Sequence, residues 1–139
     1  MKTIALLISI LSILIFSACQ SAATDNPTPM RSAAKESSVK EIPVKEAQAA
    51  LKIRDAQFID VRTKEEFSSG HAENSSNFPL DTLGQDLAKL DKKRPVYVIC
   101  ETGRRSAAGA GILNEAGFGE VYSIAGGTSA WKAAGLPIE

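Results

Sequence analysis

One stretch of this chain, residues 96–106, most limits what the polypeptide can fold into. The β-branched and aromatic run Val96–Ile99 leads directly into Cys100, and a short turn with a glycine then enters a helix-like segment. A buried strand followed by a tight turn and a helix is the repeating unit of folds with parallel sheets. The stretch therefore predicts an α/β fold with Cys100 at the junction of strand and helix.

Cys100 occupies a position that favours its reactive form. The start of a helix presents backbone N–H groups without partners, and Arg104 and Arg105 add positive charge nearby. Both features stabilise a thiolate over a thiol, and the thiolate is the nucleophilic form of cysteine. We therefore predict that Cys100 is a catalytic nucleophile.

Strands and helices alternate along the rest of the C-terminal part. We expect helices at 43–51, 63–70, 81–90, 105–116 and 128–134, and strands at 57–61, 76–78, 95–99 and 120–123. Alternation of this kind predicts a small central parallel sheet of about five strands with helices on both faces. In such folds the active site lies beyond the carboxyl ends of the strands, where we expect Cys100.

The N-terminus has the features of a secretory signal peptide. Lys2 supplies a positive charge, an almost unbroken apolar run covers residues 4–16, and two small residues precede Cys19. The run is shorter than the roughly 20 residues that a membrane-spanning helix needs. We predict a signal peptide over residues 1–18, with an uncleaved N-terminal anchor as the alternative.

Residues 16–19, Phe-Ser-Ala-Cys, resemble the bacterial lipobox, in which the cysteine is lipidated and becomes the mature N-terminus. The resemblance implies lipidation of Cys19. Gln20 stands where an Asp can signal retention in the inner membrane, which implies anchoring to the outer membrane on its periplasmic side. Residues 19–40 are rich in small and polar residues, so we expect a flexible tether there and a folded domain over residues 41–139.

Charge and cysteine content exclude several classes of function. The chain carries 16 basic and 16 acidic residues, and this balance argues against nucleic acid or a strongly acidic partner. Cys19 and Cys100 are the only cysteines, so lipidation of the first leaves no pair for a disulfide and no cluster for structural zinc. We expect no metal, no cofactor and a monomeric protein.

Several separated motifs resemble the single-domain rhodanese (sulfurtransferase) family. They are Asp-Val-Arg-Thr-Lys-Glu-Glu-Phe at 60–67, Gly-His at 70–71, Cys-Glu-Thr-Gly-Arg-Arg-Ser at 100–106, Gly-Phe at 117–118, and Gly-Gly, Trp and Gly-Leu-Pro within 126–137. The family usually continues after Gly-His with Ile-Pro-Gly-Ala, whereas this chain has Ala-Glu-Asn-Ser. The resemblance extends from about residue 42 to the end and implies a rhodanese-like fold.

The resemblance also implies a two-step transfer of sulfane sulfur. Cys100 would attack the outer sulfur of a donor such as thiosulfate, hold it as a persulfide and pass it to cyanide or an acceptor thiol. We expect the loop to bind the donor through backbone N–H groups of Glu101, Thr102, Gly103, Arg104 and Arg105. Arg105 is expected to hold the donor's oxygens and Arg104 to add to the positive field. A solvated charge at a helix start is the alternative for each arginine.

The length of the loop distinguishes sulfur transfer from the related chemistry of cysteine phosphatases. Cysteine phosphatases place an arginine six positions after the nucleophile, where this chain has Ser106, whereas Arg105 stands five positions after Cys100. A loop of this length favours sulfur over phosphate or arsenate. A second class of function stays open, namely a non-catalytic rhodanese-like module that binds a partner or carries sulfur. The intact loop favours the enzyme.

Other polar side chains in these motifs have structural interpretations. His71, the only histidine, suggests a Cys–His pair, but the resemblance implies that it caps the end of a helix. Asp60 is expected to pair with a backbone group or an arginine. Arg62 and Glu66 stand four residues apart, and we expect them to form an ion pair.

Overall fold

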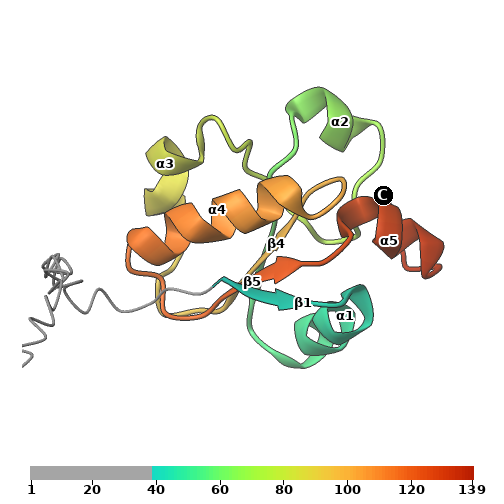
Figure 1. Ribbon diagram of the computed structural model, residues 1–139, viewed down its shortest axis with the longest axis horizontal. Coiled ribbons are helices and arrows are strands. Elements are labelled where there is room, and N and C mark those ends of the chain that lie inside the picture. The colour runs from blue at the N-terminus through green and yellow to red at the C-terminus, as the bar shows by residue number, and fades with distance from the viewer. Residues whose placement is uncertain (1–38) are drawn as a thin grey trace, which may run out of the picture. The chain divides into compact units, whose positions relative to one another are not determined.

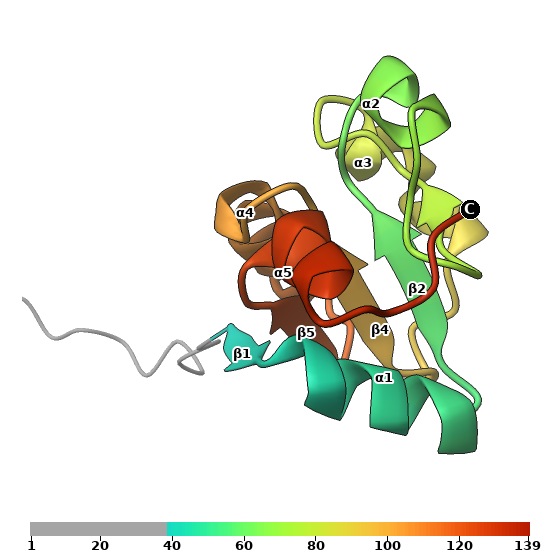
Figure 2. The same ribbon diagram turned by 90° about the vertical axis from the view of Figure 1, so that its right-hand side faces the viewer.

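A five-stranded parallel sheet organises residues 39–139, the part of the chain that the computed structural model describes (Figure 1). The strands are β1 (Lys40–Ile42), β2 (Gln57–Asp60), β3 (Ser76–Asn77), β4 (Val96–Ile99) and β5 (Val121–Ile124). Their spatial order is β1-β5-β4-β2-β3, and every neighbouring pair is parallel. Figure 2 shows β4 between β5 and β2. The predicted parallel sheet is confirmed.

Helices cover both faces of this sheet. They are α1 (Val44–Ile53), α2 (Lys64–Ser68), α3 (Leu83–Asp86), α4 (Arg104–Glu115) and α5 (Gly127–Ala133), with a 3₁₀ turn, η1 (Leu87–Lys89), after α3. Figure 1 shows α3 and α4 on one side of the sheet and α1 on the other. The predicted α/β fold with helices on both faces is confirmed.

The central strand β4 divides its side chains between two hydrophobic cores. Val96, Val98 and Cys100 pack with residues of α3 and α4 on one face. Tyr97 and Ile99 pack with residues of α1 and α5 on the other face. Because successive side chains of a strand point to opposite faces of the sheet, this alternation directs Cys100 toward α4.

β1 is absent from the sequence prediction. This edge strand pairs with β5 and begins at Lys40, the last residue of the predicted tether. Only Ile42 of its three residues is buried. A strand this short carries no readable periodicity, so its pairing with β5 is what defines it.

The prediction of one regular α-helix over residues 81–90 is wrong. α3 ends after one turn and continues as η1, in which the N–H of Leu90 donates to the carbonyl of Leu87, three residues back. Gly84 lies inside α3, and glycine lowers helix stability because it loses the most backbone freedom. The leucines still face the core, since Leu83 is buried and both Leu87 and Leu90 pack against it.

The predictions for the N-terminus fall outside the described residues. These are the signal peptide at 1–18, the lipidation of Cys19 and the tether at 19–40, of which only the last two positions are described. Within residues 39–139, none of the helices combines the length and the hydropathy needed to cross a membrane.

Candidate active site

Cys100 follows β4 directly and lies beyond the carboxyl end of that strand. The residue is 1% exposed, and its Sγ accepts a hydrogen bond of 3.1 Å from the backbone N–H of Gly103. Gly103 has a φ of 100°, a conformation that glycine adopts at little cost. This turn brings the chain back over the sulfur and into α4.

The start of α4 adds further donors beside the sulfur. Gly103 is the N-cap of α4, so Arg104, Arg105 and Ser106 form its first turn. The N–H groups of a first turn have no acceptor within the helix and carry the positive end of its dipole. The loop therefore surrounds Cys100 with groups that stabilise negative charge.

α5 holds the loop from the opposite side. The N–H and the hydroxyl of Thr128 both donate to the carbonyl of Cys100, at 2.7 and 3.1 Å. The N–H of Ser129 donates to the carbonyl of Glu101 at 3.1 Å. A Cβ at Gly127 would collide with the carbonyl oxygen of Cys100, so only glycine permits this approach. These bonds satisfy the carbonyls of Cys100 and Glu101 and hold the loop against the start of α5.

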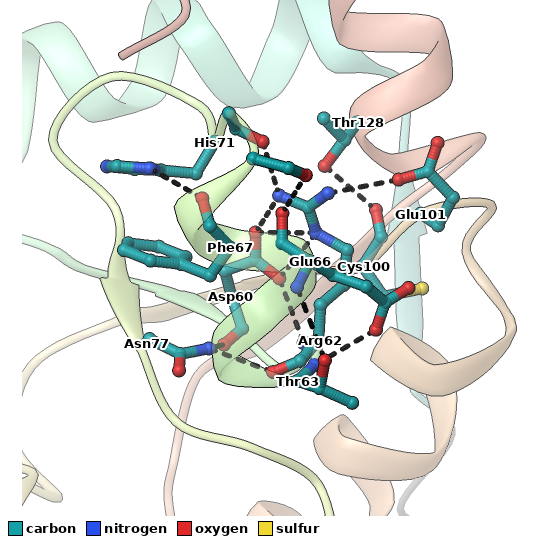
Figure 3. A network of polar contacts seen from close by, with 12 residues as sticks. Asp60, Arg62, Thr63, Glu66, Phe67, His71, Asn77, Cys100, Glu101 and Thr128 are labelled. Carbon is teal, nitrogen blue, oxygen red and sulfur yellow. Dashed lines mark hydrogen bonds and ion pairs between the residues drawn. The ribbon is translucent and has the colours of Figure 1, made fainter.

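A buried ion pair supports the loop from β2. The guanidinium of Arg62 donates to Asp60 at 2.8 and 2.9 Å, and also to the carboxylate of Glu101 at 3.1 Å and the carbonyl of Gly70 at 2.8 Å (Figure 3). Arg62 is 2% exposed and Asp60 is fully buried. The expected pairing of Asp60 with an arginine is confirmed. Through Glu101, the pair connects the end of β2 to the Cys100 loop.

The predicted ion pair between Arg62 and Glu66 is wrong. Arg62 precedes Thr63, the N-cap of α2, so the spacing rule for residues on one helix face does not apply to it. Glu66 instead accepts two hydrogen bonds from Arg105, at 2.6 and 2.7 Å. Together with the backbone N–H of Thr63, Arg105 holds the pKa of Glu66 at about 2. The carboxylate therefore stays ionised at neutral pH.

Arg104 and Thr102 lie on the outer side of the loop. Both are exposed, and among residues 39–139 Arg104 has no ion-pair partner. They border a shallow pocket beside the loop, which is lined by Leu80, Thr102, Arg104, Arg105 and Ala108. The free guanidinium of Arg104 therefore adds an uncompensated positive charge at the rim.

His71 has a structural role. Its Nδ1 lies 3.1 Å from the carbonyl oxygen of Phe67, near the end of α2, and its ring stacks on Phe67 with centroids 3.6 Å apart. Its backbone N–H and carbonyl also pair with Glu139. The interpretation of His71 as the cap of a helix end is confirmed, and Figure 3 shows the ring turned away from Cys100.

Two contributions to the site escape sequence reasoning. Glu66 reaches Arg105 across 39 positions of sequence, and Thr128 reaches Cys100 across 28. The paired glycines Gly126 and Gly127 are the only local signal of the second contact, since both have positive φ. In the described part of the chain, no group of three His, Cys, Asp or Glu side chains is arranged to hold a metal ion.

Comparison with known proteins places this geometry in a family. The sequence pattern of the rhodanese-like domain matches residues 43–134. The thiosulfate sulfurtransferase GlpE of Vibrio cholerae is 37% identical over 98 residues, which cover 70% of this chain and 92% of that protein. The GlpE protein of Shewanella oneidensis is 34% identical and covers 70% of this chain and 97% of its own length.

Solved structures agree with the sequence comparison. A rhodanese-like domain protein from Staphylococcus aureus is 32% identical, with a TM-score of 0.65, and the match covers 73% of this chain and 99% of that one. The rhodanese-like domain of an Anabaena protein has a TM-score of 0.68 at 26% identity, covering 73% and 80% of the two chains. On the match of sequence and fold, this chain belongs to the family of rhodanese-like domains.

Proposed function

We propose that this protein is a rhodanese-type sulfurtransferase that moves a sulfane sulfur from thiosulfate, or a similar donor, to a nucleophilic acceptor through a persulfide on Cys100. The observation that carries the proposal is the position of Cys100 Sγ, 3.1 Å from the N–H of Gly103 and next to the first turn of α4. The similarity to proteins named thiosulfate sulfurtransferase adds independent support.

The first step is a displacement at sulfur. The thiolate of Cys100 attacks the outer sulfur of thiosulfate, the S–S bond of the donor breaks, and sulfite leaves with the bonding electron pair. The products are a cysteine persulfide anion and sulfite, so the total charge of −3 is conserved. The loop's N–H groups stabilise the negative sulfur without a separate base.

The second step regenerates the thiolate. An acceptor thiolate or cyanide attacks the terminal sulfur of the persulfide, and the S–S bond breaks toward Cys100. Because Cys100 is the only cysteine of the folded domain, no second thiol of that domain can resolve the persulfide. The sulfur must leave to another molecule, and ping-pong kinetics follow.

The arginines divide the work of binding the donor. Arg105 uses one N–H of each terminal nitrogen for Glu66, and its remaining N–H groups stay available for the donor's oxygens. Arg104, which is exposed at the rim of the pocket, attracts the anion at longer range. We assign Arg105 the larger part.

The persulfide is tested by mass spectrometry of the intact protein. Incubation of the full chain with thiosulfate should add the mass of one sulfur atom, and reduction with an excess of thiol should remove it. The Cys100→Ala variant should gain nothing. If the wild-type protein gains no mass, or the variant gains as much, the catalytic proposal fails and a non-catalytic binding module takes its place.

The proposal includes attachment to the cell envelope. The apolar run at 4–16 and the lipobox-like residues before Cys19 support a cleaved signal peptide, a lipid on Cys19, and a monomeric domain tethered to the periplasmic side of the outer membrane. Cys19→Ser should move the protein from the membrane fraction to the soluble fraction. Unchanged partitioning would favour an uncleaved anchor instead.

A further inference from the structure

A chain of three buried side chains runs from the reactive sulfur into the protein. Cys100 Sγ lies 3.7 Å from the hydroxyl oxygen of Ser106, which lies 2.9 Å from the hydroxyl oxygen of Ser123. The three residues follow β4 or belong to α4 and β5, and none is more than 1% exposed. The transfer steps above use backbone N–H groups and leave these two hydroxyls without a role.

Each serine has one proton to donate, so when Ser106 donates to a carbonyl, Ser123 must be the donor in the bond between the two serines. Ser106 donates its proton to the carbonyl of Gly103 at 2.8 Å. Its oxygen therefore accepts from its two other neighbours, the hydroxyl of Ser123 and the S–H of Cys100. With the sulfur in its thiol form, every proton of the chain has an acceptor.

When Cys100 ionises, Ser106 must change from accepting a hydrogen bond from the sulfur to donating one to it. Once the thiol proton has left to solvent, a lone pair of the Ser106 oxygen would face a negative sulfur. Rotation of the hydroxyl turns its proton from the carbonyl of Gly103 to the sulfur. That carbonyl stays satisfied, because the N–H of Ala107 also donates to it at 3.1 Å. Ser123 can keep its bond to Ser106 throughout.

We propose that Ser123 is a positioning residue for the ionised sulfur of Cys100 and acts through Ser106. Its donated hydrogen bond occupies a lone pair of the Ser106 oxygen and orients the Ser106 proton toward the thiolate, and toward the inner sulfur of the persulfide. The second part of this inference rests on the proposed function, whereas the first concerns the free enzyme alone.

The pH profile of Cys100 alkylation tests the inference without any sulfur donor. The full chain is reacted with iodoacetamide between pH 5 and pH 10, and the rate at Cys100 is read from its peptide by mass spectrometry. A hydrogen bond to an ion is worth enough to move such a midpoint by about one pH unit. Ser106→Ala should move it upward by about that amount, and Ser123→Ala in the same direction by less.

The double variant separates action through Ser106 from independent action. If Ser123 works only through Ser106, the variant with both alanines should have the midpoint of Ser106→Ala alone. Two shifts that add would overturn the inference. Ser123→Thr keeps the hydroxyl and should keep the wild-type midpoint, so a shift as large as that of Ser123→Ala would also overturn it.

Ser75→Ala is the matched control. Ser75 is a buried serine whose hydroxyl has no partner in the described part of the chain, and it does not contact the Cys100 chain of hydroxyls. Its removal should leave the midpoint unchanged. A Ser123→Ala midpoint no higher than that of Ser75→Ala would disprove the role of Ser123, even if the wild-type protein turns over thiosulfate. A failed persulfide test would leave the alkylation result standing.

Discussion

Two arginine–carboxylate pairs flank the Cys100 loop, and they differ mainly in burial. Arg62 and Asp60 are 2% and 0% exposed, whereas Arg105 and Glu66 are each 36% exposed. The hydrogen bonds of the two pairs have similar lengths, from 2.6 to 2.9 Å between the guanidinium and carboxylate atoms that approach most closely.

The difference in burial gives the two arginines different roles: Arg62 supports the loop, and Arg105 can bind a ligand. Breaking a buried pair leaves a charge without water or a partner, so Arg62 is confined to its position. A half-exposed pair gains little over hydration of its members, so Arg105 can exchange Glu66 for another anion. The same chemistry therefore fixes the loop on one side and leaves a replaceable contact on the other.

The largest effect is expected from breaking the buried pair. Arg62→Met should lower the free energy of unfolding by about 3–5 kcal/mol, because it leaves Asp60 buried and unpaired. Urea unfolding measures the loss, with the exposed Arg104→Met as control. Adding Asp60→Leu to Arg62→Met should restore part of the stability, and a double variant less stable than Arg62→Met would contradict this account.

The next effect concerns the half-exposed arginine. Arg105→Ala should lower kcat/KM for thiosulfate by about 10- to 100-fold, the range expected for lost hydrogen bonds between ions, with unfolding changed little. Arg104→Ala should lower kcat/KM by a smaller factor, because Arg104 acts on the donor only through its positive charge at the rim of the pocket. Steady-state kinetics with thiosulfate and cyanide compare the two, and equal losses would show that Arg105 has no special part.

A smaller effect is expected when Glu66 loses its charge. Glu66→Gln keeps a side chain that can complete the capping box with Thr63, but it no longer neutralises Arg105. The KM for thiosulfate should fall by about 3- to 10-fold, as expected for removing one negative charge near the donor. A KM that rises would mean that Glu66 serves chiefly to hold Arg105 in place.

The smallest effect is the pH dependence of stability at Glu66. Its pKa is lowered to about 2 in the folded protein, chiefly by Arg105. The stabilisation is therefore complete above its ordinary value of 4.5 and is lost as the pH falls toward 2. At neutral pH it is worth at most about 1 kcal/mol, since the pair is half-exposed. Wild type and Glu66→Gln, compared by urea unfolding at several pH values, should converge progressively as the pH falls from 4.5 toward 2. A stability difference between the two proteins that stays the same at every pH would show that the Arg105–Glu66 ion pair is not the source of the difference.

Local signals in the sequence were sufficient for most elements. Thr63 and Glu66 form the capping box of α2, in which the Glu66 N–H donates to Thr63 Oγ1 at 3.3 Å, and this agrees with the helix expected to begin at residue 63. The prediction of one helix at 81–90 failed because the spacing of the leucines shows which face is buried. It does not show whether the backbone stays α-helical. β1 was missed because three residues carry too little pattern.

The sequence by itself determined the strand–loop–helix unit that holds Cys100. The apolar run of β4, the glycine of the turn and the period of α4 all act between near neighbours, so they can be read directly. Only the tertiary structure decided which partners the charged and hydroxyl groups of this unit take. Glu101 pairs with Arg62, Arg105 with Glu66 and Ser106 with Ser123, and these partners lie 17 to 39 positions away in the sequence. Burial by elements distant in sequence selects these partners, because a buried charge or hydroxyl must find its partner wherever the sheet brings one.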